Sequence, residues 1–365
     1  MASARAFFGQ TLNRRTIMSI PLAVRRTARS TSSSHESPAS PARATPTGRM
    51  SWLIIAALIA VPLYAQATQQ PFLLTLVTRI AILAIAAMSL DLILGVGGLV
   101  SFGHALFFGL GAYATGMLAQ HGVSSGWLHL LCAVAVSALV AAVTGAIALR
   151  TRGIAFIMIT LAFAQMFYFF AVGLREYGGD DGFALAAGSQ FGAVQLTDPL
   201  TLYVVSACLL MALLAFGRRF LHTAMGMTLG GIRINERRMQ ALGIPTTRCK
   251  RAAYVVAAVL SSVAGMLFAN LTQFVAPSYL SWTMSGDLIV MVVIGGTGTF
   301  IGAVLGAFAI VLAEEGLKAM TEHWMLVMGP LIVVAVLVNR HGLTRLLESF
   351  GARTARSPRA TGEQV

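Results

Sequence analysis

The sequence predicts an all-α, polytopic membrane protein with about ten transmembrane helices, and three observations predict this class. The chain of 365 residues is 57% hydrophobic and only 11% charged, and its mean hydropathy is +0.78. Apolar runs of roughly 20 residues, long enough to cross a bilayer as a helix, recur along it. Because lipid offers the backbone no hydrogen-bond partner, such runs must satisfy their own amides and therefore form helices.

Residues 1–49 differ in composition from the rest of the chain. They contain eight Arg, one Glu and a stretch rich in Ser, Pro, Thr and Ala, which cannot bury a core. We expect a disordered or mis-started N-terminal extension, because Met50 stands directly before the first apolar run. An Arg-rich, acid-poor transit peptide is the alternative.

The expected transmembrane permease domain covers residues 50–345, and a cytoplasmic tail covers 346–365. Candidate crossings lie at 51–67, 72–94, 98–118, 127–149, 153–174, 199–217, 252–272, 285–297, 300–317 and 324–339. The run at 285–297 is short and rich in Gly, which leaves open whether it crosses the membrane fully.

The distribution of charge predicts the orientation of the chain. Most of the 26 basic residues are Arg at the ends of apolar runs, the pattern typical of cytoplasmic loops. Ten crossings place both termini, Arg150, Arg152 and the loop 218–251 on the cytoplasmic side. This arrangement explains the pI near 10.8 without a nucleic-acid partner.

An internal repeat relates residues 89–102, SLDLILGVGGLVSF, to residues 285–300, SGDLIVMVVIGGTGTF. Both copies contain Ser-x-Asp-Leu-Ile, an apolar stretch, a glycine pair and then Ser or Thr before Phe. Hydrophobic segments that glycine interrupts in two related halves indicate the pathway of a transporter. The glycine pairs are Gly97–Gly98 and Gly295–Gly296.

Small residues continue both copies at a spacing of four, so that they share one face of a helix. They are Ser101, Ala105 and Gly109 in the first copy and Gly298, Gly302 and Gly306 in the second. Such a face lets another backbone approach closely, which predicts helix packing, a translocation path, or both.

Few polar residues interrupt the predicted spans. His104 follows the first glycine pair, and Thr160 and Gln165 stand in the fifth run. Each either packs helices through a hydrogen bond or faces a path. Arg79 and Asp91 share the second run but stand twelve positions apart and do not face each other directly. Both are near enough to a span end to snorkel or to pair elsewhere.

Residues 230–251, GGIRINERRMQALGIPTTRCKR, form a charged segment between apolar runs. A helix is expected over 232–242, since neither Gly nor Pro interrupts it. Gly243 supplies the left-handed position beyond its end, and Pro245 prevents continuation.

On this expected helix Ile232, Met239 and Leu242 form a narrow apolar stripe. A short helix with so small a stripe cannot stabilise itself in water. It therefore needs a groove on a partner, or alternatively the surface of an anionic membrane.

Motifs for catalysis are missing from the sequence. It contains no P-loop pattern, no His-Glu-x-x-His and no Gly-x-Ser-x-Gly, so we expect no enzyme and no catalytic residue. Cys132, Cys208 and Cys249 lack the spacing of metal ligands. They are expected to be free packing residues, with no disulfide and no metal site.

Five segments occur in a specific order between residues 72 and 320. They are LDLILGVGGLVSFGHALFFGLGAYATGML, RGIAFIMITLAFAQMFYF, YGGDDGF, GIRINERRMQALGIPTTRCKRAAYVVAAVLSSVAGML and VIGGTGTFIGAVLGA. Together they resemble the permease subunit of high-affinity branched-chain amino-acid ABC importers. The resemblance implies the type II ABC importer permease fold, a bacterial inner membrane, and no cofactor in this chain, because ATP is hydrolysed by partner subunits.

The resemblance also implies partners: a second permease subunit, two ATP-binding subunits and an extracytoplasmic solute-binding protein. In this family a coupling helix docks on the ATP-hydrolysing subunit, and it corresponds to residues 231–243 here. The implied coupling residues are Arg233, Asn235, Glu236, Met239, Ala241, Leu242 and Gly243.

The sequence departs from the family pattern in its N-terminal extension and in an outer loop, REYGGDDGF at 175–183. Glu176, Asp180 and Asp181 in this loop are candidates for docking the binding protein or for an outer gate. A solvated turn is the alternative. Relatives with these motifs carry branched-chain amino acids, urea, short amides or aromatic acids, so the solute is not specified.

Two other classes of function stay open. An ion-coupled secondary transporter needs acids near the midplane, and Asp91 and Asp287 are its candidates. An intramembrane enzyme or scaffold would need a catalytic pair, which the sequence does not display.

Overall fold

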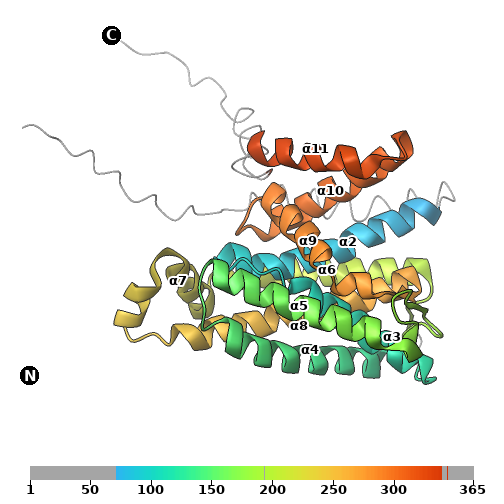
Figure 1. Cartoon of the computed structure of the whole chain (residues 1–365), viewed down its shortest axis with the longest axis horizontal. Helices are drawn as coiled ribbons and strands as arrows, with labels where there is room; N and C mark the ends of the chain where they lie inside the picture. Colours follow the sequence, from blue (N-terminus) through green and yellow to red (C-terminus); the bar gives the residue numbers. More distant parts are fainter. Residues whose placement is uncertain (1–70, 193, 339–342, 344–365) are drawn as a thin grey trace, which may run out of the picture. The chain divides into compact units, whose positions relative to one another are not determined.

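The computed structural model describes residues 71–338 and 343, with the exception of residue 193. These residues are largely helical (Figure 1). The predicted extension 1–49, the predicted span 51–67 and the tail 346–365 lie outside the described residues.

The helices follow the predicted spans in order. Their bounds are α2 Pro71–Asp91, η2 (a π-helix) Leu92–Val96, α3 His104–Gln120, α4 Gly126–Ala148, α5 Ile154–Gly173, η3 Arg175–Tyr177, α6 Pro199–Leu221, α7 Ala224–Ala241, α8 Thr246–Thr272, η4 Pro277–Leu280, α9 Trp282–Gly295, α10 Phe300–Met320 and α11 Trp324–Val338. Every span predicted within the described residues therefore corresponds to a helix, which confirms the all-α class.

Six helical segments of the described chain are long and apolar enough to cross a membrane: α2 with η2, α4, α5, α6, α8 and α10. The helix α9 has 14 residues. At 1.5 Å per residue it is about 21 Å long, less than the ~30 Å of a hydrocarbon core. The helix α9 alone is therefore shorter than a full crossing.

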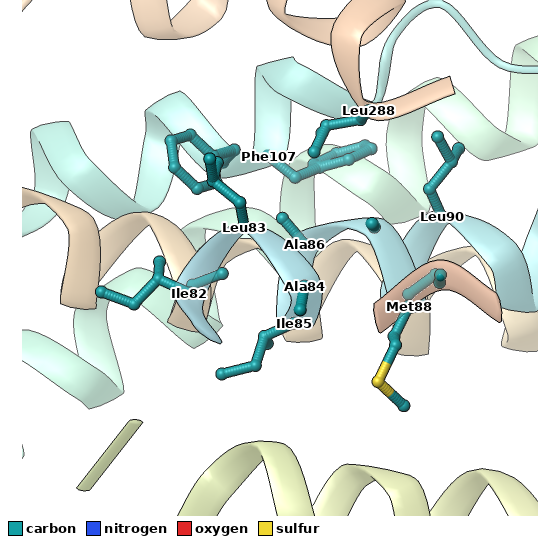
Figure 2. Close-up of a cluster of buried hydrophobic side chains, with 14 of the residues drawn as sticks. Ile82, Leu83, Ala84, Ile85, Ala86, Met88, Leu90, Phe107 and Leu288 are labelled. Atoms are coloured by element: carbon teal, nitrogen blue, oxygen red, sulfur yellow. The ribbon is translucent and has the colours of Figure 1, made fainter. Parts of the chain in front are cut away.

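The helix α2 occupies the centre of the core. It packs against α6, α8, α9 and α10, and its side chains from Ile80 onward are buried on every face. Figure 2 shows residues of this helix pointing in several directions, with Phe107 of α3 and Leu288 of α9 close by. In α4 and α5 most side chains are half-buried or exposed, so these helices lie at the periphery of the chain.

Close approach of α3 and α8 depends on two glycines. A Cβ at Gly111 of α3 would overlap the carbonyl oxygen of Ser262, and a Cβ at Gly265 of α8 would overlap that of Phe108. Since the obstructing atoms are backbone, no rotamer change could make room. The two helices are thus in backbone contact because both positions lack a side chain.

The loops between the helices carry four short strands. They pair antiparallel as β1 Phe183–Ala184 with β4 Phe274–Val275, and as β2 Gln190–Phe191 with β3 Val194–Gln195. The first pair ties the loop that follows α5 to the end of α8.

A buried polar cluster anchors the same loop. The amide of Asn270 accepts a hydrogen bond from the Ser189 backbone N–H at 2.8 Å and donates to the Ser189 hydroxyl at 3.0 Å. His129 contacts this hydroxyl through Nδ1 at 2.7 Å and the Val123 carbonyl through Nε2 at 2.8 Å. The carbonyl can only accept, so Nε2 carries the proton and Nδ1 accepts from Ser189.

Candidate functional site

The glycine-rich segments of the two sequence copies meet in the structure. The backbone N–H of Gly298 donates a hydrogen bond to Oδ1 of Asp91, at 2.7 Å. A Cβ at Gly95 would overlap the backbone of Gly298. We call this contact, between residues 95–98 and 295–298, the glycine crossing. The two segments that the sequence repeat relates therefore pack directly against each other.

Conformation also requires glycine at the crossing. The φ angles are +68° at Gly98, +113° at Gly296 and +84° at Gly298, a region that residues with a Cβ rarely adopt. The predicted span 98–118 is therefore wrong at its start. Residues 97–103 are non-helical, because the glycine pair ends the π-helix η2, and α3 begins only at His104.

The serines of the two copies both reach the start of α3. The Ser285 hydroxyl accepts a hydrogen bond from the Ala105 backbone N–H at 3.0 Å. The Ser89 hydroxyl donates to the Ala86 carbonyl at 2.6 Å and contacts Nε2 of His104 at 2.7 Å. Because this hydroxyl has a single proton, which it gives to Ala86, His104 donates to it from Nε2. Its fully buried ring thus packs α2 against α3 by a hydrogen bond.

The non-helical segment is held against α5 by polar contacts. The Phe102 backbone N–H donates to the Thr160 hydroxyl at 3.3 Å, and the Gly103 N–H donates to the Ser101 hydroxyl at 3.3 Å. Gln165 lies further along α5 and is half-buried. The structure therefore brings Thr160 against the non-helical segment that contains Ser101, and the hydrogen bonds to this segment do not involve Gln165.

The small residues that continue each copy are packing positions. Gly302 and Gly306 of α10 face α9, where Cβ atoms would meet the carbonyl oxygens of Gly295 and Met291. Gly109 of α3 faces Leu280. These positions let backbones approach closely, as the spacing of four predicted.

The charged segment is not a continuous helix. Asn235 has φ −156° and ψ 97° inside α7, and its side chain accepts a hydrogen bond from the Arg238 backbone N–H at 3.0 Å. Asn is a preferred N-cap and starts a new helical turn here. The expectation of one helix over 232–242 is therefore wrong at this residue. The left-handed position of Gly243 is confirmed, with φ +80°.

The break also separates the predicted apolar stripe. Ile232 is buried and Met239 packs against Gly231, whereas Leu242 is 69% exposed. Ile234, which the helical wheel did not select, is 76% exposed. The large apolar residues that are exposed in the segment are thus Ile234 and Leu242. An isolated large apolar residue within a charged run was the signal that could have identified Ile234.

Glu236 forms ion pairs within the chain. Its carboxylate lies 2.6 Å from Lys250 Nζ of α8 and 3.3 Å from Arg152 Nε, and its side chain is 15% exposed. Burial alone would raise the pKa of Glu236, but the hydrogen bond and charge of Lys250, together with the charge of Arg152, lower it below the usual value. These contacts connect the part of α7 that follows the break at Asn235 to α8 and to the loop before α5.

Arg233 is an exposed residue whose guanidinium reaches the glycine crossing. Its Nη1 donates a hydrogen bond to the carbonyl oxygen of Gly95. Its Cγ lies 2.8 Å from the position a Cβ would take at Gly98. Ala241, in contrast, is exposed near the end of α7. Among the predicted coupling residues, Arg233 thus connects the charged segment to the contact between the two copies.

The acidic residues of the outer loop face solvent. Glu176, Asp180 and Asp181 are all exposed. The loop turns through Gly178 and Gly182, whose φ angles are +77° and +79°. Its acids are therefore displayed on a glycine-shaped turn.

A charged network joins α2 and α10. Arg79 lies 3.0 Å from both Glu314 and Glu315, and Lys318 lies 2.6 Å from Glu314. Both helices are candidate spans, and Arg79 pairs with acids of α10 rather than with Asp91. The partners are more than 230 positions apart in sequence, a contact that spacing alone could not indicate.

Comparisons with known proteins identify relatives over most of the chain. Residues 72–336 match the family model of the branched-chain amino acid transport system permease component. The chain is 28% identical over 313 residues to the high-affinity branched-chain amino acid transport system permease protein LivM of Salmonella typhimurium, covering 79% of this chain and 73% of that protein. LivM of Escherichia coli is 25% identical, with 78% and 74% covered. LivH of Escherichia coli is 23% identical, with 71% and 90% covered. No solved structure matches significantly.

Proposed function

Because the chain belongs to the family of permease components of branched-chain amino acid transport systems, we propose that it forms half of the translocation path of an ATP-driven importer. The proposal places it in the bacterial inner membrane with ten crossings and both termini in the cytoplasm. A second permease subunit forms the other half. Two ATP-binding subunits drive the cycle, and an extracytoplasmic binding protein delivers the solute.

The solute class follows from the relatives. LivM and LivH carry names that specify high-affinity branched-chain amino acid transport. We assign the same class, or related small solutes, to this chain.

The exposed pair Ile234 and Leu242 is the observation that carries the coupling proposal. Both lie on the segment 231–243, between α6 and α8. Keeping such large apolar side chains exposed to water is energetically unfavourable. A groove on an ATP-binding subunit would bury both side chains. ATP-driven closure of the two motor subunits would then move this segment and rock the Gly-rich helices of the path.

The variant Ile234→Asp with Leu242→Asp tests this function. We expect ATP-driven solute uptake into vesicles containing the complete importer to fall at least about tenfold, because two charged residues would face an apolar groove. Co-purification of the ATP-binding subunits should fall in parallel. Arg251→Ala changes an exposed residue of α8 and is the control. It should retain both solute uptake and co-purification of the ATP-binding subunits.

The same vesicles separate the importer from an ion-coupled carrier. Uptake by the unmodified chain should require ATP and should continue after an uncoupler collapses the proton gradient. Uptake that needs no ATP but stops with the uncoupler would replace this proposal by the carrier, with Asp91 and Asp287 as its candidate acids.

The exposed outer acids support docking of the binding protein. Charges at the rim of an interface mainly accelerate encounter and fix register. We expect Asp180→Asn with Asp181→Asn to raise the half-saturating concentration of the binding protein about threefold to tenfold at low salt, and less at high salt. Asp198→Asn, which removes an exposed helix-capping acid, is the control.

Titration of uptake against binding-protein concentration measures this effect. An unchanged half-saturating concentration at low salt would leave the loop as a simple turn. A fall in maximal rate alone would make the two acids an outer gate instead.

A further inference from the structure

We infer that Arg233 is a positioning residue that latches the glycine crossing shut, and that the crossing is the cytoplasmic gate of the path. The inference deepens the proposed function and rests on it. It concerns the residue that transmits movement of the segment 231–243, rather than the surface on which a motor subunit docks.

The first support is the carbonyl group that Arg233 binds. Gly95 lies in η2, at the end of which the Gly98 and Leu99 backbone N–H groups bond to the carbonyls of Leu94 and Ile93. The Gly95 carbonyl instead accepts from Arg233 Nη1. Gly95 is buried, so withdrawal of the guanidinium would leave a buried acceptor without this partner.

The second support is charge. Asp91 is fully buried, its Oδ1 accepts from the Gly298 backbone, and its Oδ2 has no hydrogen-bond partner within the described residues. Arg233 Nη1 lies 3.5 Å from the position a Cβ would take at Gly298, the residue whose N–H binds this carboxyl group. Removing Arg233 would therefore take a cation away from a buried, incompletely bonded acidic group.

The third support is steric. Gly98 has no side chain, and the Arg233 Cγ fills the space that its Cβ would occupy. Gly95 and Gly298 touch through backbone atoms, so no interlocking side chains hold them together. The crossing is therefore closed by a few polar contacts, of which the Arg233 contact comes from the moving segment.

The location of Arg233 explains how movement would reach the gate. It precedes exposed Ile234 and lies two residues before the break at Asn235. The turn after the break is tied to α8 by Glu236 and Lys250. Displacement of Ile234 by a docked motor would thus pull Arg233 out of the crossing while the following turn stays attached to α8.

The test measures access to the crossing directly. In the complete importer, with the three native cysteines replaced by serine, Val96→Cys places a thiol at a buried position of η2. A membrane-impermeant maleimide added to the cytoplasmic face of inside-out vesicles should label this thiol slowly without ATP. Adding Arg233→Ala should raise the labelling rate about tenfold or more, the effect of losing a hydrogen bond to a charged group.

Two further variants and one control complete the design. Arg233→Lys keeps the charge but not the planar fork, so its labelling rate should be intermediate. Gly98→Ala keeps the arginine but displaces its side chain, and should also raise labelling. Arg251→Ala removes an exposed charge near the start of α8. In this variant the thiol at position 96 should be labelled at the parental rate.

The ratio of ATP hydrolysed to solute imported gives an independent readout. A leaking gate should raise this ratio while the ATP-binding subunits stay bound and active. Parent-like labelling in both Arg233→Ala and Gly98→Ala would overturn the latch, even if transport were lost. A failure of the unmodified importer to use ATP would instead reject the proposed function, so the two failures are distinguishable.

Discussion

Replacing Gly306 by leucine is expected to prevent the permease from folding in the membrane. Gly306 of α10 faces α9, where an added Cβ would overlap the Met291 carbonyl oxygen and lie 3.0 Å from the Gly295 backbone nitrogen. Overpacking a core usually costs about 1–3 kcal/mol, with side chains absorbing part of the strain. Here the obstacle is backbone, so α9 and α10 would have to separate, and we expect a loss at or above that range.

Gly316→Leu is the matched control for this variant. It makes the same substitution in the same helix, but a Cβ at Gly316 meets no atom within 4 Å. We expect the control to retain near-parental abundance and thermal stability in detergent, whereas Gly306→Leu should lose most folded protein. Equal abundance of the two variants would show that α9 and α10 are not held by this contact.

The positions of the helices could be predicted because hydrophobic length is a local property. The runs at 127–149 and 153–174 correspond closely to α4 and α5. Helix ends could be predicted where a single residue type, such as glycine, dictates the local backbone conformation. Gly243 is such a residue, since its left-handed conformation follows from the lack of a side chain.

Errors occurred where a side chain overrides the local pattern. Between Ile232 and Leu242 neither Gly nor Pro interrupts a helix, yet Asn235 ends one turn and caps the next. Asn competes with the helix by bonding to nearby backbone, and propensity summed over the segment hides that competition. The predicted stripe therefore combined Leu242, which is exposed, with Ile232, which is buried.

Long-range polar contacts could not be predicted at all. Nothing in the local sequence relates Arg79 to Glu314 or Ser189 to Asn270, because these pairs form only when distant helices pack. The internal repeat predicted two related segments but not a contact between them, and in the structure they touch through Gly95 and Gly298.

These observations separate two kinds of contact in the charged segment. Arg233 and Glu236 were both predicted to couple the chain to a motor, but both side chains are directed to this chain. Apolar Ile234 and Leu242 remain exposed. The segment therefore combines an outward apolar surface with inward polar anchors, an arrangement suited to passing movement from one to the other.

The ion pair between Glu236 and Lys250 is expected to have a large effect on the stability of the folded protein. Glu236→Gln is expected to destabilise the folded protein by about 3 kcal/mol, because it removes the carboxylate that compensates Lys250. That lysine side chain is only 6% exposed, and the carboxylate lies 2.6 Å from its Nζ. A fall of several degrees in the thermal unfolding midpoint in detergent would measure the loss. Glu322→Gln, at an exposed acid, should leave the midpoint unchanged.

Removing the charge of Lys250 as well as that of Glu236 distinguishes an uncompensated buried charge from a general packing defect. Glu236→Gln with Lys250→Met should recover much of the lost stability, because a buried ion pair exchanged for uncharged groups is often close to neutral. If the double variant is as unstable as the single one, the carboxylate contributes through Arg152 or through packing, and the account based on Lys250 is wrong.

The pH dependence gives this prediction its sign. The folded-state pKa of Glu236 lies below the ordinary carboxyl value of about 4.3, so the unfolded chain binds a proton at higher pH than the folded chain does. The stabilisation from its ion pairs is therefore complete above the ordinary value and is lost as pH falls through the lower folded-state pKa. Parent and Glu236→Gln should differ most near neutral pH and converge in acid. A difference that grew with acidification would contradict the assignment, because protonated Glu236 would then stabilise the fold more than its carboxylate does.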